Sequence, residues 1–313
     1  MTDRKGDVHM KIATTTADFG YGCKNDTERI RALYEAGFRY IDFSMYSLSN
    51  DSVYMGDGWR EAVRALRTEA EALGMRFVQA HSPGGNPLTN DPDRLKSLTA
   101  TTLRSIEICE LLGIENTVVH TGFGRGISKE EWFERNREFY RVLFPYMEHC
   151  GVNVLIENST RANMGEMYFT NTGKDMREFL SFADHPQLHA CWDTGHGNCE
   201  GAQYEEILTL GEELYAIHYN DNRGTRDDHM LPYLGTMNHD EIMNALLAVG
   251  YRGYFTLECT SSMCSMRARH RGRTDFPWES PLGPPPLFLQ RGLEALLYET
   301  AKYILSAYGA FEE

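Results

Sequence analysis

Residues 188–196 read LHACWDTGH, and this stretch decides the fold. It is a short run of apolar and aromatic residues that ends in an acid, Asp193, and is followed by a loop containing glycine. Strands that are buried on both faces of a parallel sheet are apolar at nearly every position. We therefore interpret residues 188–193 as a parallel β-strand whose carboxyl end presents a polar side chain.

The same pattern recurs along the chain, which indicates eight parallel strands. Each run is short and rich in β-branched and aromatic residues. The predicted strands cover residues 11–13, 40–43, 77–81, 117–120, 152–157, 188–193, 216–218 and 254–258. Polar residues close six of these runs. An open doubly wound sheet would concentrate its site at one switch point, so this spread favours a closed (β/α)8 TIM barrel.

Amphipathic stretches between the runs predict the helices of the barrel. Capping residues mark their limits: Asp91 and Pro92 start one helix, and Gly113 ends it. The predicted helices cover residues 27–36, 59–73, 92–112, 129–149, 174–182, 204–210, 240–249 and 287–307. No change in composition divides the chain. We therefore expect one barrel domain over residues 1–313, with a polar N-terminal tail (1–9) and a Pro-rich loop (275–286) before the last helix.

The composition excludes several classes of protein. The chain has 313 residues, of which 42% are hydrophobic and 24% charged, so it is neither disordered nor fibrous. No apolar run approaches the roughly 20 residues that a membrane helix needs, and the polar N-terminus carries no secretory signal. The seven cysteines show no paired spacing, which favours reduced thiols. We expect a cytoplasmic protein that does not bind membranes.

The charge balance argues against a nucleic-acid partner. Lys and Arg number 31 against 45 Asp and Glu, which gives a formal charge of −14. Affinity for phosphate backbones comes mainly from clustered Lys and Arg. The one strongly basic patch, residues 267–273, lies in the predicted loop after the last strand, where an anionic substrate or a neighbouring subunit is the commoner partner. Phe276 and Trp278 in the Pro-rich loop make a lid or a homo-oligomer contact a further option.

Six polar side chains close six of the predicted strands, and in a barrel they converge on one mouth. They are His81, His120, Glu157, Asp193, His218 and Glu258. Burying these groups together is costly unless a cation or a shared proton compensates. Two Glu, one Asp and one His of this set make an oxygen-rich site, which favours one divalent ion such as Mn²⁺, Mg²⁺ or Co²⁺. His196, Asp227 and His229 lie just beyond the strand ends. Adding His81, His120, Asp227 and His229 to the site would tilt it toward Zn²⁺ or more than one metal.

These motifs resemble the xylose-isomerase-like TIM-barrel superfamily of sugar phosphate isomerases and epimerases, which also includes ketose 3-epimerases, inosose dehydratase and endonuclease IV. The resemblance covers roughly residues 11–262 and is carried by residues 156–158, 192–196, 217–222, 227–235 and 250–258. In the epimerase branch it implies one divalent metal held by Glu157, Asp193, His218 and Glu258. His196 would then contact substrate. Endonuclease IV implies four further metal ligands, at His81, His120, Asp227 and His229.

The sequence therefore predicts a metal-dependent isomerase or epimerase that acts on a sugar, a sugar phosphate or a polyol. The metal would stabilise an enediolate, and Glu157 and Glu258 would be the catalytic residues that remove and return the proton. The predicted substrate-binding residues are His81, His120, His196, Asp227 and His229.

Three other functions stay open from the sequence. In an inosose dehydratase-type lyase, a β-hydroxyl group leaves from the same site. In a multi-zinc phosphodiesterase like endonuclease IV, the additional ligands bind zinc, although the net charge of the chain argues against DNA. A sugar-binding barrel without catalysis would have no need for paired glutamates.

Overall fold

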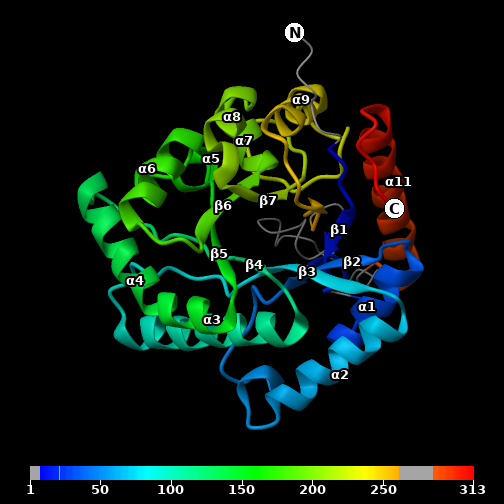
Figure 1. Cartoon of the computed structure of the whole chain (residues 1–313), viewed down its shortest axis with the longest axis horizontal. Helices are drawn as coiled ribbons and strands as arrows, with labels where there is room; N and C mark the ends of the chain where they lie inside the picture. The colour runs from blue at the N-terminus through cyan, green and yellow to red at the C-terminus, as the bar shows by residue number, and fades with distance from the viewer. Residues whose placement is uncertain (1–7, 21, 261–284) are drawn as a thin grey trace, which may run out of the picture.

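The computed structural model describes residues 8–20, 22–260 and 285–313, and these form the predicted (β/α)8 TIM barrel. Figure 1 shows the strands arranged in a ring with the helices outside it. The strands are β1 (Ile12–Thr15), β2 (Tyr40–Ser44), β3 (Arg76–His81), β4 (Asn116–Val118), β5 (Asn153–Glu157), β6 (Leu188–Asp193), β7 (Leu214–His218) and β8 (Phe255–Leu257).

The strands follow one another around the ring, and β1 pairs with both β2 and β8. The last contact, between β7 and β8, is a single parallel bridge of Tyr219 and Leu257. There the Tyr219 N–H donates to the Thr256 carbonyl at 2.7 Å, and the Glu258 N–H donates to the Tyr219 carbonyl at 3.1 Å. The Thr256 hydroxyl also donates to Gln79 Oε1 at 3.1 Å, from β8 across the interior to β3.

The helices match the predicted ranges to within one residue at each end. They are α1 (Asp26–Glu35), α2 (Trp59–Ala72), α3 (Pro92–Leu112), α4 (Lys129–Cys150), α6 (Gly173–Ala183), α8 (Tyr204–Leu210), α9 (His239–Val249) and α11 (Leu287–Ala307). Capping residues explain this agreement between predicted and observed helix limits. The Asp91 side chain accepts hydrogen bonds from two N–H groups at the start of α3, and Gly113 ends the helix in the left-handed conformation.

Two short helices lie among the site loops and were not predicted, α5 (Arg161–Met164) and α7 (Thr194–Glu200). Short 3-10 turns were also not predicted: η1 (Thr16–Phe19), η2 (Val53–Met55), η3 (Gly165–Met167) and η4 (Gly211–Glu213). The sequence of α7, TGHGNCE, has weak helix propensity because it contains two glycines. Its start is fixed by Asp193, whose side chain accepts from the His196 N–H at 2.6 Å.

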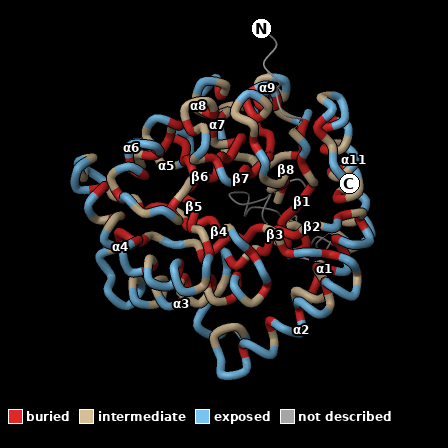
Figure 2. Tube along the Cα trace, in the orientation of Figure 1, coloured by how far each residue is buried: buried red, intermediate tan, exposed pale blue. Residues whose placement is uncertain are grey.

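The barrel has a large core outside the strands and a small one inside. The outer core packs the helices against the strands, and Figure 2 shows the buried residues concentrated along the ring. The inner cluster comes from four consecutive strands, β4 to β7, and consists of Val118, Leu155, Cys191 and Ala216. The other strands place polar groups in the interior, because Asp42, Gln79 and Thr256 are all buried.

Two register shifts interrupt the ladders. In β3, Ile41 and Asp42 of β2 face Phe77 and Gln79, so Val78 is an extra residue. In β7, the partners of Ala190 and Cys191 are Leu214 and Ala216, which leaves out Tyr215. Bulges of this kind redirect side chains, and both bulged residues lie near the amino-terminal end of the barrel.

Several sequence predictions fall outside the described residues. These are the N-terminal tail up to residue 7, the basic patch 267–273 and the Pro-rich loop 275–286 except for its last two positions. Six of the seven cysteines are described, and all six are free thiols. Within the described ranges, no helix combines the length and apolar character needed to cross a membrane.

Candidate active site

The predicted site residues gather at the carboxyl ends of the strands. His81, Glu157, Asp193 and His218 are the last residues of β3, β5, β6 and β7. Two observed strands end before the predicted limit: β4 stops two positions before His120, and β8 stops directly before Glu258. Parallel strands in a barrel all end at one mouth, so these side chains meet there.

A central cluster joins three carboxylates to one imidazole. Donor atoms of Glu157, Asp193, His218 and Glu258 all lie within 4.8 Å of one another. The His218 Nδ1 atom contacts Glu157 Oε1 and lies 3.2 Å from Glu258 Oε2. Asp193 and His218 are fully buried, and the side chains of Glu157 and Glu258 are 4% and 17% exposed.

Two asparagines that the sequence did not single out hold Asp193 in place. The Asn158 side chain accepts from the Asp193 N–H at 2.6 Å and donates to its carbonyl at 2.9 Å. The Asn220 amide donates to Asp193 Oδ2 at 2.8 Å. Both follow strand-end residues in the sequence, Asn158 by one position and Asn220 by two. That position, and their place in the segments 156–158 and 217–222 that carry the family resemblance, are the signals that could have found them.

Two further clusters flank the central one. The first flank contains His81, His120 and Glu157; the second contains His196, Asp227 and His229. In the first, His120 Nε2 lies 3.1 Å from His81 Nε2 and 2.7 Å from Glu157 Oε2. In the second, Asp227 Oδ2 lies 3.2 Å from His196 Nε2 and 3.0 Å from His229 Nε2. Glu157 therefore belongs to both the central cluster and the first flank.

Three of the flanking histidines share one hydrogen-bond pattern. The Nδ1 atom of each faces a backbone carbonyl: Ser82 for His81 at 2.8 Å, Asn158 for His196 at 2.8 Å, and Glu258 for His229 at 3.0 Å. With the proton on Nδ1, the Nε2 lone pair points into the cluster. Metal-binding histidines are held in the same way, with the distal N–H on a carbonyl or carboxylate.

Burial and like charge determine the electrostatics of the central cluster. Burial raises the pKa of Glu258, and the neighbouring charges of Glu157 and Asp193 add to this. Burial also raises the pKa of Asp193. For Glu157 burial acts in the same direction, but the imidazoles of His218 and His120 hold its pKa well below the ordinary value. Three carboxylates this close carry more negative charge than one imidazole neutralises.

The flanking histidines differ in their protonation. Burial, with the charge of His120, lowers the pKa of His81 to about 3, so this ring is a neutral lone-pair donor. Burial alone would lower the pKa of His196, but Asp193 and Asp227 raise it to about 10. A proton therefore occupies the space between His196 and Asp227 unless a cation takes its place.

The residues fit a divalent cation. The central cluster offers three carboxylates and one imidazole, a donor set that suits a hard or borderline ion. Its surplus negative charge is what a cation would neutralise. Among the described residues, Asp227 Oδ1 is buried and has no hydrogen-bond partner, which leaves one carboxylate oxygen of the second flank uncommitted.

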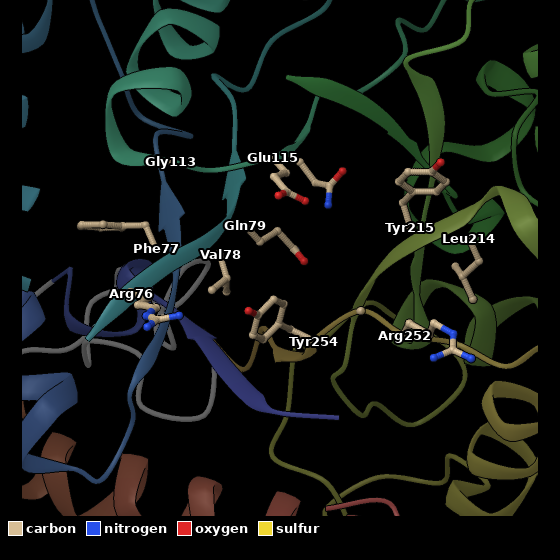
Figure 3. Close-up of a pocket in the computed structure, with 12 residues that line it drawn as sticks. Arg76, Phe77, Val78, Gln79, Gly113, Glu115, Leu214, Tyr215, Arg252 and Tyr254 are labelled. Carbon is tan, nitrogen blue, oxygen red and sulfur yellow. The ribbon is translucent and has the colours of Figure 1, made fainter. Parts of the chain in front are cut away.

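A cavity of about 500 Å³ lies away from this site, at the amino-terminal mouth. Figure 3 shows it lined by the starts of β3 and β7 and by the residues that precede β4 and β8, with Arg76 and Arg252 on different sides. Arg76, Glu115 and Arg252 are exposed, and the bulged residues Val78 and Tyr215 also line the cavity. None of the three donor clusters includes a residue of this cavity.

A protein-family model described as xylose isomerase-like TIM barrel matches residues 30–277 of the chain. Among curated proteins, fructoselysine 3-epimerase of Escherichia coli O157:H7 is 28% identical over 121 residues, which is 37% of this chain and 42% of that enzyme. The match therefore spans less than half of the enzyme.

Solved structures share the fold over nearly the whole chain. D-Psicose 3-epimerase from Clostridium cellulolyticum H10, determined with D-tagatose, superposes with a TM-score of 0.72 at 20% identity, covering 95% of this chain and 99% of the other. An AP endonuclease of family 2 from Brucella melitensis superposes with a TM-score of 0.63 at 17% identity, covering 80% and 93%. Identities this low establish the fold alone.

Proposed function

Because this chain belongs to the xylose isomerase-like TIM barrel family, we propose that it is a divalent-metal-dependent sugar isomerase or epimerase. The observation that supports this most is the central cluster, in which Glu157 and Glu258 approach His218 from two strands while Asp193 completes the donor set. The substrate would be a ketose, its phosphate or a related polyol.

In the proposed mechanism Glu157, Asp193, His218 and Glu258 would hold the metal. When bound, it would polarise the substrate carbonyl and stabilise the negative charge that develops on oxygen. One of the two glutamates takes the proton from carbon, and the other returns it. Return to the opposite face of the same carbon inverts that centre, and return to the adjacent carbon interconverts aldose and ketose.

The flanking residues would orient the substrate. His81 and His120 line one side of the central cluster, and His196, Asp227 and His229 line the other. Their nitrogen and oxygen atoms can bind sugar hydroxyl groups on both sides of the reacting carbon. Asn158 and Asn220 hold Asp193 so that its geometry does not depend on the substrate.

A proton-exchange experiment tests this function. The metal-loaded protein is incubated with D-fructose, D-tagatose and a set of polyols in heavy water, and deuterium bound to carbon is measured by NMR. An epimerase or isomerase incorporates deuterium at the reacting carbon. A lyase would release water and form an unsaturated or deoxy product instead. If none of these compounds exchanges a proton, the proposal is wrong.

The flanking clusters favour a second candidate, a multi-metal phosphodiesterase. Three histidines that present Nε2 lone pairs, together with the shared Glu157, could hold more than one ion. Elemental analysis separates the candidates: about one Mn, Mg or Co per chain supports the isomerase, and two or three zinc ions with cleavage of an abasic oligonucleotide support the phosphodiesterase. The charge of −14 disfavours a nucleic-acid substrate.

A further inference from the structure

Tyr46 is a half-exposed aromatic side chain beside the candidate site. Of four aromatic residues that could stack on a sugar, Trp192 and Tyr219 are 1% and 0% exposed and belong to the core. Phe123 stacks on Tyr168 with ring centroids 5.7 Å apart. Tyr46 is 52% exposed, so its ring has surface left for a ligand.

The ring of Tyr46 lies directly against the first flank. Its centroid is 5.3 Å from that of His81, at an angle of 73°, and 6.1 Å from that of His120, at an angle of 66°. Both contacts are edge-to-face, a favourable geometry for aromatic pairs. Burial raises the pKa of the Tyr46 phenol, and the negative charges of Glu157 and Glu258 raise it further. The phenol therefore lies close enough to both glutamates to interact with them electrostatically.

Gly84 provides the space that the Tyr46 ring occupies. A Cβ atom at position 84 would lie 2.4 Å from Tyr46 Cζ and 2.5 Å from Cε2, closer than real Cβ contacts. Gly84 is not among the glycines with positive φ, so its backbone conformation does not require glycine. The Gly84 N–H also donates to the Tyr46 carbonyl at 3.0 Å, which ties the two loops together.

We propose that Tyr46 is a substrate-positioning residue, whose ring, seated on Gly84, receives the C–H face of a sugar beside His81 and His120. This inference rests on the proposed function and names the side of the site where the non-reacting end of the sugar lies. Aromatic rings offer such a face a flat apolar surface with little loss of side-chain entropy. Tyr46 acts on binding, while the proton transfer belongs to the glutamates.

Substitutions at both positions test the inference. Tyr46→Ala is expected to raise KM for D-tagatose or D-fructose about tenfold, equivalent to about 1.4 kcal/mol, with kcat changed less than threefold. Gly84→Ala displaces the ring and should give a similar increase. In the double variant the alanine at position 84 no longer meets a ring, so the two effects should not add.

Matched controls separate a substrate contact from a structural role. Gly58→Ala is the control glycine, because a Cβ atom there would meet no described residue within 4 Å beyond its own chain neighbours, and its φ is negative. Tyr303→Ala is the control tyrosine, because it is 64% exposed on α11. Both should leave KM unchanged. The metal content of Tyr46→Ala should equal that of the wild type, and its Tm should fall by no more than a few degrees, because each lost aromatic contact contributes about 0.5–1.5 kcal/mol.

Direct binding distinguishes the two ways of failing. Calorimetric titration of D-tagatose and D-fructose into Glu258→Gln measures binding without turnover. If the wild type converts neither ketose and this variant binds neither, the proposed function fails and the role of Tyr46 falls with it. If the wild type is active but Tyr46→Ala keeps the wild-type KM, or the two substitutions add fully, only the inference about Tyr46 is overturned.

Discussion

The two mouths of the barrel differ in how their polar groups are arranged. At the carboxyl-terminal mouth, nine side chains form three connected donor clusters, and all nine are buried or half-buried. At the amino-terminal mouth, a cavity of about 500 Å³ has Arg76, Glu115 and Arg252 at its rim as separate, exposed groups. This cavity and the converging donor atoms therefore lie at opposite ends of the barrel. Convergence is the better guide to chemistry, because it is energetically costly unless a ligand or metal compensates.

The largest expected effect comes from removing one of the paired glutamates. Glu157→Gln and Glu258→Gln should each lower turnover by about 10²–10⁴-fold, the range that general acid–base groups contribute. Glu115→Gln is the matched substitution at the amino-terminal mouth and should retain full turnover. Rates are measured by deuterium incorporation into an identified ketose. Near wild-type rates in either Glu157→Gln or Glu258→Gln would contradict the prediction that proton transfer takes place at the carboxyl-terminal mouth.

Removing the metal should destabilise the folded protein, because the proposed metal ligands lie at the carboxyl-terminal mouth. A metal present at about a hundred times its Kd stabilises by about 2.7 kcal/mol, so chelation should lower Tm by about 5 °C. Added Mn²⁺ should restore it. The shift should be small in Asp193→Asn, which loses a ligand, and unchanged in Arg252→Ala. An identical Tm with and without chelator, measured by calorimetry, would contradict a metal at the central cluster.

Asp42 lies between the two mouths and makes stability depend on pH. It is fully buried, and this burial raises its pKa to about 7 against the opposing effects of the His218 imidazole and a hydrogen bond from Thr15. The folded protein therefore binds this proton more tightly than the unfolded chain, and stability falls as pH rises from about 4 to 7. Asp42→Asn should be more stable than the wild type at pH 8, by about 1–3 kcal/mol, and nearly equal to it at pH 4.5.

Urea unfolding at both pH values, with the same metal content, measures this difference. Asp240→Asn serves as the control, because Asp240 is an exposed carboxylate on α9. A constant difference between wild type and Asp42→Asn across the pH range would show that Asp42 does not retain its proton in the folded state.

The smallest effects are expected at the amino-terminal mouth. Arg76→Ala and Arg252→Ala remove exposed groups, and surface substitutions of this kind usually change stability by no more than about 0.5 kcal/mol. Turnover and metal content should remain at wild-type values. A loss of activity in either variant would mean that the cavity of Figure 3 also serves the reaction.

The fold could be predicted from the sequence because the local signals for strands and for helix ends agree with the alternating strand–helix order of a barrel. Apolar runs, caps such as Asp91 and terminal glycines such as Gly113 lie where the structure needs them, and the limits of α3, α8 and α11 matched to the residue. The family and the barrel are confirmed. The site residues come together as expected from strand ends, while their roles stay predictions.

The remaining features depend on contacts between distant segments. Helix α7 forms because Asp193 caps a sequence with poor propensity, which no local pattern reveals. The seat of Tyr46 on Gly84 joins the loops after β2 and β3, and Gly84 in sequence indicates only a turn. Asp42 was visible as an acid inside an apolar run, but its complete burial becomes apparent only in three dimensions.

The single bridge between β7 and β8 gives a bound cation a second consequence. Tyr219 and Leu257 form the bridge, and the residues next to them in sequence, His218 and Glu258, belong to the central cluster. An ion bound by both residues would link β7 and β8, the pair of neighbouring strands with the least backbone pairing. Amide hydrogen exchange at Tyr219 and Glu258 would then slow when the metal binds. Local opening of the barrel would therefore be least frequent in the metal-bound, catalytically competent protein.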